Sequence, residues 1–528
     1  GNSITSGGDY NTVVGDEAGT ALTTADKNVA VGYQALATET GGYLNIAIGA
    51  GALQNQNGGS YNVAVGHEAG NDITTGVNNT LIGALAGDAI TTGDNNVALG
   101  YEALTANTVG DRSTALGNYA LKSQNPSSNA DMYNVAIGHN AGGDVTTGTN
   151  NTLIGGLAGD AITTGGDNVA VGFNALTANT TAGYNVAFGT NTLAGNTTGS
   201  ENAVFGGAAG LANTTGTGLT GAGYTALRFN TTGNYNTALG DAALYSNTTA
   251  DYNTATGYKA GYSNTTGNRN VSVGANAIYT NSTGDDNTAV GYAALYSNTT
   301  ASDNSAFGHG ALFANTTGAN NSGFGYKALN ANTTASGNTA VGYSAGLNNT
   351  TGADNVSLGY NTLYTNTTAS DNTAIGSHAL YANTGASNTA LGRQALRFNS
   401  SASNNTAVGY QAGYSNTTGT QNTSLGTFSG YRLTTGSYNT TVGYNSGYTT
   451  TGSSNTSLGN SALLSNTTAS NNTAVGWYTL FNNTTGTTNT AVGGGVAGSV
   501  LSTMENNTTG SSNSAFGIGA LGSNTTAS

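Results

Sequence analysis

The hydrophobic and polar positions of this chain recur with a period of 17 residues. The repeat reads N-T-A-V-G-Y-x-A-L-x-x-N-T-T-G-x-x, and we number its positions from the opening Asn, so that Asn28 is position 1 and Leu44 is position 17. Thirty copies follow a partial first one. Position 2 is mostly Thr or Val, and position 4 is Val, Leu, Ile or Phe in 28 copies. This two-residue alternation predicts a short strand, and we expect its position 4 side chain to point into the core.

Two turns bound each predicted strand. Position 5 is Gly in all thirty copies, from Gly15 to Gly517. A glycine that recurs without exception indicates a backbone conformation or a close approach that a Cβ atom would forbid. The closing N-T-T-G supplies the second turn. Since 17 residues cannot fold alone, neighbouring repeats must share a core. The sequence therefore predicts an all-β fold, a parallel β-solenoid (β-roll) of stacked 17-residue coils.

Position 9 tests this prediction. It is usually Leu but is Gly in 11 copies, and each of those copies places a bulky apolar residue at position 10 or 12. Gly70 comes with Ile73 at position 12, whereas Gly210 comes with Leu211 at position 10. A small interior that must be filled to native density explains the exchange. The Asn residues at positions 1 and 12 should form columns that hydrogen-bond along the axis.

The repeats predict one continuous array over residues 1–528, which we expect to be a segment of a longer protein. Two copies carry insertions, near 122–133 and 496–506. The first contains the single proline, Pro126, and the second contains Met504. Proline cannot donate to a strand ladder, so its place in an insertion agrees with a continuous sheet. We expect the extra residues near Pro126 and Met504 to protrude as loops.

Composition narrows the classes of function. Gly numbers 83, charged residues make up 6%, and there is no Cys. The net charge of −14 comes without any basic patch, so we expect no nucleic-acid partner. No apolar run approaches the roughly 18 residues of a membrane span, so we expect none in this segment.

The residues of types that catalyse reactions or bind metals do not form a recognisable motif in the sequence. His67, His139 and His309 occupy position 6, where Tyr, Asp and Ala also occur, and His378 occupies position 7. This free exchange indicates variation on an exposed face, so we predict no enzyme, no cofactor and no metal site. Acidic residues do not recur at one repeat position, which argues against a column of calcium ions. Many N-x-T triplets match glycosylation acceptors, but Asn and Thr here also suit turns and ladders.

The run N-T-A-V-G-Y-x-A-L at 287–295 resembles repeats of bacterial tail-fibre-domain surface proteins and phage tail fibres. The N-x-[AV]-[AVIL]-G core is similar to the head repeats of trimeric autotransporter adhesins, which use a shorter repeat. The resemblance implies an extracellular or cell-surface location and association with further copies of the chain as a trimer or filament bundle.

The sequence thus predicts the structural shaft of an extracellular fibre that self-associates through its repeat faces. Two alternatives stay open: an adhesin or receptor-binding fibre that recognises glycans or a host surface, and an ice-binding protein with Thr columns. The mixed occupants of position 6 predict an exposed column, which would be an assembly interface or a ligand platform. This contact stripe consists of Tyr33, Tyr101, Tyr224, Tyr258, Tyr292, Tyr326, Tyr343, Tyr360, Tyr410, Tyr444 and Trp477.

Overall fold

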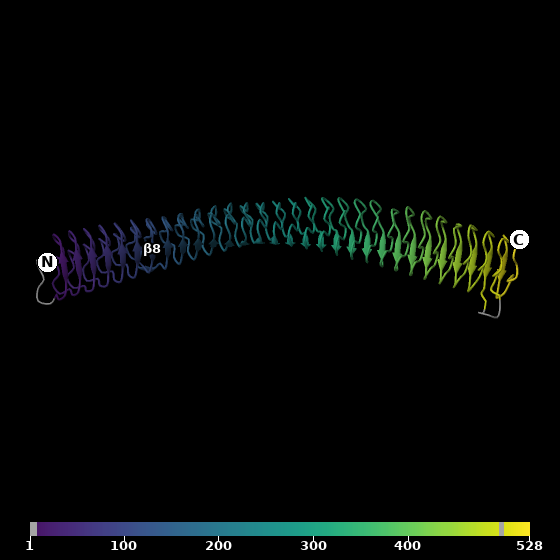
Figure 1. Cartoon of the computed structure of the whole chain (residues 1–528), viewed down its shortest axis with the longest axis horizontal. Coiled ribbons are helices and arrows are strands. Elements are labelled where there is room, and N and C mark those ends of the chain that lie inside the picture. The colour runs from purple at the N-terminus through teal and green to yellow at the C-terminus, as the bar shows by residue number, and fades with distance from the viewer. Residues whose placement is uncertain (1–7, 496–500) are drawn as a thin grey trace. The chain divides into compact units, whose positions relative to one another are not determined.

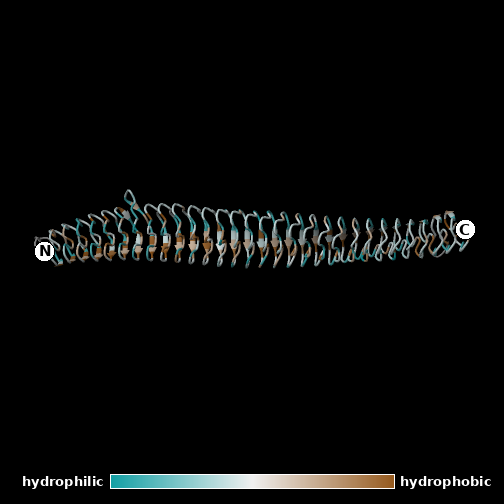
Figure 2. Ribbon diagram, turned by 90° about the horizontal axis from the view of Figure 1, so that it is seen from above, coloured by the Kyte–Doolittle hydropathy of each residue, from teal (hydrophilic) through white to brown (hydrophobic). Residues whose placement is uncertain are grey.

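The computed structural model describes residues 8–495 and 501–528. The chain divides into two compact units, unit 1 (Gly1–Asn268) and unit 2 (Arg269–Ser528). Each unit is a stack of coils without helices among its described residues, and the strands of successive coils lie side by side (Figures 1 and 2).

The strands of unit 1 are β1 (Thr12–Val14), β2 (Val29–Val31), β3 (Ile46–Ile48), β4 (Val63–Val65), β5 (Thr80–Ile82), β6 (Val97–Leu99), β7 (Gly110–Asp111), β8 (Thr114–Leu116), β9 (Ala130–Asp131), β10 (Val135–Ile137), β11 (Thr152–Ile154), β12 (Val169–Val171), β13 (Val186–Phe188), β14 (Ala203–Phe205), β15 (Thr220–Ala222), β16 (Thr237–Leu239) and β17 (Thr254–Thr256). Apart from β7 and β9, they form one parallel ladder in chain order.

The strands of unit 2 form a second run in chain order: β18 (Val271–Val273), β19 (Thr288–Val290), β20 (Ser305–Phe307), β21 (Ser322–Phe324), β22 (Thr339–Val341), β23 (Val356–Leu358), β24 (Thr373–Ile375), β25 (Thr389–Leu391), β26 (Thr406–Val408), β27 (Thr423–Leu425), β28 (Thr440–Val442), β29 (Thr456–Leu458), β30 (Thr473–Val475), β31 (Thr490–Val492) and β32 (Ser514–Phe516). They too pair in parallel with their neighbours in sequence.

Each three-residue strand covers positions 2 to 4 of its repeat and pairs in register with the strand of the next repeat. Val29 lies opposite Ile46, for example, and Ala30 lies opposite Ala47. One repeat is therefore one coil, and the predicted parallel β-solenoid of 17-residue coils is confirmed.

The position 5 glycines are required for both predicted reasons. Gly172 has a φ of 136°, in the region that L-residues with a Cβ rarely adopt. A Cβ atom at Gly172 would also lie 2.5 Å from the carbonyl oxygen of Gly189 in the next coil. Stacking at this turn brings backbone directly against backbone, so the column excludes every side chain.

The orientation of the strand is opposite to the predicted one. Ala30 and Ala170 at position 3 are fully buried, whereas Val14 and Phe188 at position 4 are 58% and 54% exposed. Successive strand residues face opposite sides, so the pattern V-A-V fits either orientation. Our prediction that position 4 points inward is wrong because Asn, Ala and Leu at positions 1, 8, 9 and 12 already fill most of the narrow interior. Position 3 therefore holds a small residue in most coils, and a larger one such as Leu81 fits where position 9 is Gly.

We predicted that a bulky residue at position 10 or 12 fills the space left by Gly at position 9. This is confirmed where the bulky residue stands at position 12, and it is wrong where it stands at position 10. Ile73 is fully buried, and a Cβ on Gly70 would lie 3.1 Å from its Cδ1. Leu211 is only half-buried. Instead, Leu193 of the preceding coil fills the space, since a Cβ on Gly210 would lie 2.8 Å from its Cδ2. Interior volume is therefore shared between coils rather than balanced within each one.

Two columns of buried Asn side chains hold the coils together, as predicted. At position 1, the Nδ2 of Asn28 donates to the carbonyl of Gly42 in its own coil (2.9 Å), and its Oδ1 accepts from the backbone N–H of Asn45 in the next coil (2.9 Å). At position 12, the Nδ2 of Asn213 donates to Oδ1 of Asn196 (2.7 Å) and to the carbonyl of Gly216 (3.0 Å). Each side chain thus closes one turn and links two coils.

The insertions contribute to the interior as well as to the surface. Near 122–133, residues 127–129 are exposed, but Pro126 and Met132 are buried against Gly110. The short strands β7 and β9 pair beside them. Met504 is fully buried, at the place that Leu480 occupies one coil earlier. Residues 496–500 of the second insertion lie outside the described residues. The exposed residues 127–129 agree with the predicted protrusion near Pro126, whereas Pro126 and Met504 themselves pack inside.

Candidate functional site: an aromatic groove in unit 2

Positions 6, 7 and 10 form one outer surface of each coil, which we call the turn face. The position 5 glycine turns the chain outward, and position 7 is left-handed, as in Lys327, Ser344 and Asn361, with φ between 51° and 53°. Positions 8 and 9 then turn inward, and position 10 emerges again beside position 6. In this way three separated positions of one coil lie together, and the same positions of the next coil follow them.

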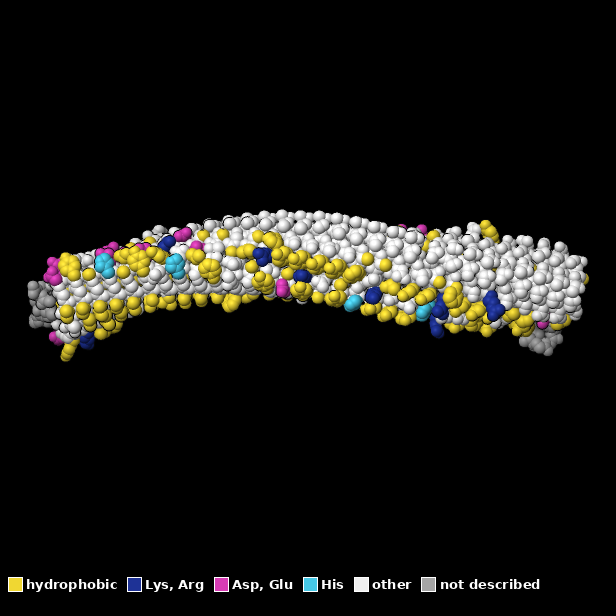
Figure 3. All heavy atoms as spheres, turned by 45° about the horizontal axis from the view of Figure 1, so that its top comes forward, with side chains coloured by type: hydrophobic (Ala, Val, Ile, Leu, Met, Phe, Trp, Pro, Cys, Tyr) yellow, Lys and Arg dark blue, Asp and Glu magenta, His cyan; other side chains and the backbone are white. Residues whose placement is uncertain are grey.

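The predicted contact stripe lies on the turn face. Its ten tyrosines are 38% to 63% exposed, and Trp477 is half-buried against Tyr478, with ring centroids 4.2 Å apart. Figure 3 shows hydrophobic side chains in rows along the coils, with charged groups scattered among them. The exposed location of this column, inferred from its mixed occupants, agrees with the structure.

The structure brings only part of the stripe together. In unit 2, Tyr326, Tyr343 and Tyr360 follow one another, with ring centroids 5.0 and 5.4 Å apart and interplanar angles of 15° and 20°. His309 and Tyr292 extend the row at 5.3 and 5.1 Å. The stripe tyrosines of unit 1, namely Tyr33, Tyr101, Tyr224 and Tyr258, are instead separated by coils that place other residues at position 6.

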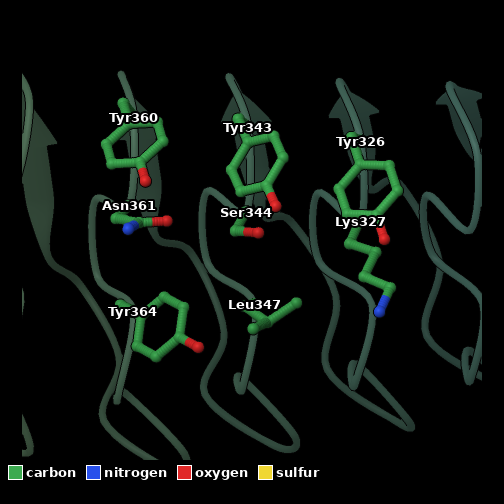
Figure 4. A pocket seen from close by; sticks show the side chains of 8 residues that line it. All are labelled: Tyr326, Lys327, Tyr343, Ser344, Leu347, Tyr360, Asn361 and Tyr364. Carbon is green, nitrogen blue, oxygen red and sulfur yellow. The ribbon is translucent and has the colours of Figure 1, made fainter.

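The three consecutive tyrosines form one wall of a groove of about 300 Å³. Leu347 and Tyr364 at position 10 form the other wall. Lys327, Ser344 and Asn361 at position 7 line the floor between the walls (Figure 4). Sequence reasoning missed these five residues, although the recurrence of Tyr at position 10 in neighbouring copies was a visible signal.

The exposed lining of the groove is mostly polar, because the tyrosine rings stack on one another along one wall. The Lys327 ammonium lies 5.3 Å from the centroid of the Tyr326 ring, a cation–π arrangement. Ser344 is buried, at 4% exposure. The Oδ1 atom of Asn361 is buried and accepts no hydrogen bond from any described residue. The groove therefore presents a cation and polar groups beside the stacked rings, whereas the Oδ1 atom of Asn361 is enclosed.

The histidines lie on the turn face, beside aromatic and polar neighbours. His309 stacks between Tyr292 and Tyr326. Nδ1 of His378 lies 2.9 Å from Oγ of Ser377, and burial, together with Arg397 and Arg393, lowers the pKa of His378. Over residues 8–495 and 501–528, no three His, Cys, Asp or Glu side chains are grouped to hold a metal ion. Within the same ranges, no helix has the length and apolarity of a membrane span.

The Asn and Thr residues of the closing turn are structural. Asn213 and Asn264, which begin two N-x-T triplets, are at most 1% exposed and hydrogen-bond inside the coil. In many coils the first Thr of the T-T pair bonds along the axis: the hydroxyl of Thr214 donates to the carbonyl of Thr231 (2.9 Å). These hydroxyls are thus engaged within the ladder, whereas the second Thr of the pair, such as Thr215, is exposed.

Comparison of the chain with protein-family models gives no match, and comparison with curated proteins gives none either.

Proposed function

We propose that this chain is the structural shaft of an extracellular fibre and that it self-associates through the outer face of its strands. The solenoid architecture fits a fibre-like shaft, because stacked identical coils give length and stiffness without requiring a reactive site. The extracellular location rests on the resemblance of the repeat to those of bacterial surface proteins and phage tail fibres.

The observation that carries self-association is the exposed apolar column at position 4. Phe188 and Phe205 lie in paired strands and are 54% and 45% exposed. Leu99 (47%), Leu358 (43%) and Leu391 (44%) continue the column in other coils. Monomeric soluble proteins seldom expose apolar patches of more than a few hundred Å². A second copy of the chain, which carries the same column, is the partner that fits a repeating apolar strip.

Sedimentation velocity on the full chain tests this proposal. We expect the unmodified chain to form oligomers and the double variant Phe188→Asp/Phe205→Asp to dissociate, because two carboxylates would be buried without partners in the interface. Phe173→Asp is the matched control: Phe173 is 52% exposed in the preceding coil but lies on the turn face. Its oligomers should persist.

Circular dichroism should show the same strand content in all three chains, since the substituted side chains lie outside the coil. A chain that stays monomeric at all concentrations would refute self-association. Equal dissociation by Phe173→Asp would place the interface on another face.

A further inference from the structure

The charged side chains of the turn face differ in sign between the two units. Positions 6, 7 and 10, together with the adjoining position 11, carry nine acidic and three basic residues in unit 1. The same positions in unit 2 carry one acidic residue, Glu505, and four basic residues, namely Lys327, Arg393, Arg397 and Arg432. Because the whole chain has a net charge of −14, the basic turn face of unit 2 is an exception to the overall composition.

Three of these basic residues lie within three successive coils, those of β25, β26 and β27. We call Arg393, Arg397 and Arg432 the basic patch. None of them forms an ion pair with a described residue. The guanidinium carbon of Arg393 lies 5.9 Å from the centroid of the Tyr410 ring, and that of Arg397 lies 5.3 Å from the centroid of the Phe398 ring. The basic patch therefore combines uncompensated positive charge with aromatic surface.

An acidic patch of the same length lies in the coils of β4, β5 and β6 of unit 1. It consists of Glu68, Asp72, Asp88 and Glu102. Asp72 is exposed, and the other three are half-buried. Asp88 accepts a hydrogen bond from the hydroxyl of Thr105 in the next coil. No Lys or Arg side chain of the described residues pairs with any of the four, so no permanent cation compensates this patch.

The two patches have the same spacing along the coil axis. Arg393 and Arg432 are two coils apart, and so are Glu68 and Glu102. Each pair therefore spans about 10 Å, because neighbouring strands lie about 4.8 Å apart. In each patch, the first of the two coils carries a second charge of the same sign. Two chains that run in the same direction would thus bring the two doubly charged coils together.

A second copy of the chain is the partner that both patches favour. Arg and aromatic side chains are enriched in protein interfaces, and Phe398, Tyr410 and Tyr101 beside the patches are 41%, 38% and 40% exposed. Each exposed ion pair contributes little by itself, so these rings are needed to supply apolar area. A small anion would neutralise the basic patch alone, whereas a second copy supplies both signs at the same spacing.

We propose that the acidic patch of one copy contacts the basic patch of a second copy that runs in the same direction, with Glu68 facing Arg393 and Glu102 facing Arg432. This contact uses the turn face and does not depend on association through the strand faces. An apolar column that recurs in every coil allows two chains to slide past each other by whole coils. Two charged patches allow one register only, so the turn-face contact determines the stagger between neighbouring shafts.

The contact is tested in a parent chain that carries Phe188→Asp/Phe205→Asp, so that the strand faces do not associate. Sedimentation velocity should show association of this parent at about 0.1 M salt, where charges interact over about 10 Å, and its loss at about 1 M salt, where the range is about 3 Å. No association at the lower salt would overturn the turn-face contact. Apolar association resists salt, so parent oligomers that persist at the higher salt would instead count against the strand-face proposal.

Charge reversal identifies the residues. In this parent, Arg393→Glu/Arg432→Glu is the glutamate variant and Glu68→Lys/Glu102→Lys is the lysine variant. We expect each to weaken association by about tenfold or more, because like charges then face each other. An equimolar mixture should recover the association of the parent to within about threefold, since each variant supplies the sign that the other lacks. A mixture that associates no more tightly than the better single variant would overturn the proposal.

Folding and net charge are controlled separately. The altered positions already accept the new types of side chain elsewhere: position 7 holds Lys327, position 6 holds Asp241 and position 11 holds Asp144. Circular dichroism should therefore be unchanged. Asp167→Lys/Glu201→Lys alters the net charge as the lysine variant does, but at position 17, which precedes the strand. Mixed with the glutamate variant, this control should not restore association, and equal rescue would overturn the assigned pairing.

Discussion

The two units share one backbone design but differ in how continuously their interiors are apolar. In unit 1, the buried apolar side chains form one cluster that extends from Ala18 to Ala260. In unit 2, the described residues form three clusters, which extend over 277–345, 363–412 and 462–515. The gaps between the clusters of unit 2 coincide with coils in which Ser or Thr replaces Ala at positions 3 and 8.

The larger gap, between the cluster that ends at 412 and the one that begins at 462, contains a network of buried hydroxyls. Oγ of Ser429 donates to Oγ1 of Thr441 (2.8 Å), which donates to Oγ of Ser424 (3.1 Å). One coil further, Oγ of Ser446 lies 2.7 Å from Oγ and 2.9 Å from the carbonyl oxygen of Ser457, so its single hydrogen is shared between these two acceptors. In the coil of β28, every buried side chain is polar: Asn439, Thr441, Ser446 and Thr450 accompany two glycines.

This difference shows that a coil keeps its shape without an aliphatic interior of its own. The strand ladder and the glycine column are continuous within each unit, and position 1 is Asn in nearly every coil, so a polar coil is held by its neighbours. Stability in such arrays is a sum of coil and interface contributions. We therefore expect the units to respond alike to changes in the backbone columns and differently to changes in the interior.

The largest expected effect is common to both units. Gly172→Ala in unit 1 and Gly291→Ala in unit 2 place a Cβ atom 2.5 and 2.6 Å from the carbonyl oxygen of the next coil. Both also put Ala at a φ near 135°. We expect each to lower the free energy of unfolding by about 4 kcal/mol or more. Hydrogen exchange with mass spectrometry should show comparable loss of protection in the coils around each site, and a tolerant unit 2 would contradict the shared design.

A cavity in the continuous interior of unit 1 should have the next largest effect. Leu81 occupies position 3, where Ala is usual, and its two methyl groups fill the space beside Gly70 and Gly87. Leu81→Ala restores the commonest residue, yet it should cost about 2–5 kcal/mol because the cavity cannot collapse. Denaturant unfolding measures the loss. The control Phe173→Ala removes a side chain that is 52% exposed on the turn face and should cost less than about 1 kcal/mol.

The hydroxyl network of unit 2 should respond to single and paired changes with different signs. Ser446→Ala leaves Oγ of Ser457 without its donor and should cost about 1–2 kcal/mol. Ser446→Ala/Ser457→Ala removes both partners and should be neutral or stabilising. Hydrogen exchange of the β28 and β29 amides measures both effects. If the double variant loses as much protection as the single one, the hydroxyls stabilise the coil in their own right.

The smallest expected effect is the pH dependence of the stability of unit 2. Burial and two arginines lower the pKa of His378, so the folded state favours the neutral ring. Between the folded pKa and about 6.5, the unfolded chain binds the proton more readily, so stability is complete above this window and falls as the pH falls through it. Unfolding midpoints at about pH 7.5 and about pH 5.5 should differ slightly more for the unmodified chain than for His378→Gln. An identical pH dependence would show that His378 does not contribute.

The sequence alone was sufficient for features that depend on one position of the repeat. The period, the strand at positions 2 to 4, the turn at each invariant glycine and the two Asn columns were all predictable, because stacking multiplies a local preference along the axis. The exchange of Leu at position 9 for Ile73 at position 12 was predictable for the same reason.

The tertiary structure alone decided which side of each strand faces inward and which positions meet on the surface. The pattern V-A-V fits a strand whose Val side chains face inward and equally one whose Ala side chain faces inward. Only the closed coil shows that Asn28, Ala35 and Leu36 leave room for Ala30 rather than Val31. The groove depends on positions 6, 7 and 10 of three successive coils, which a turn of left-handed residues brings together. Enclosure and proximity arise from the path of the whole coil, and a one-dimensional pattern does not contain that path.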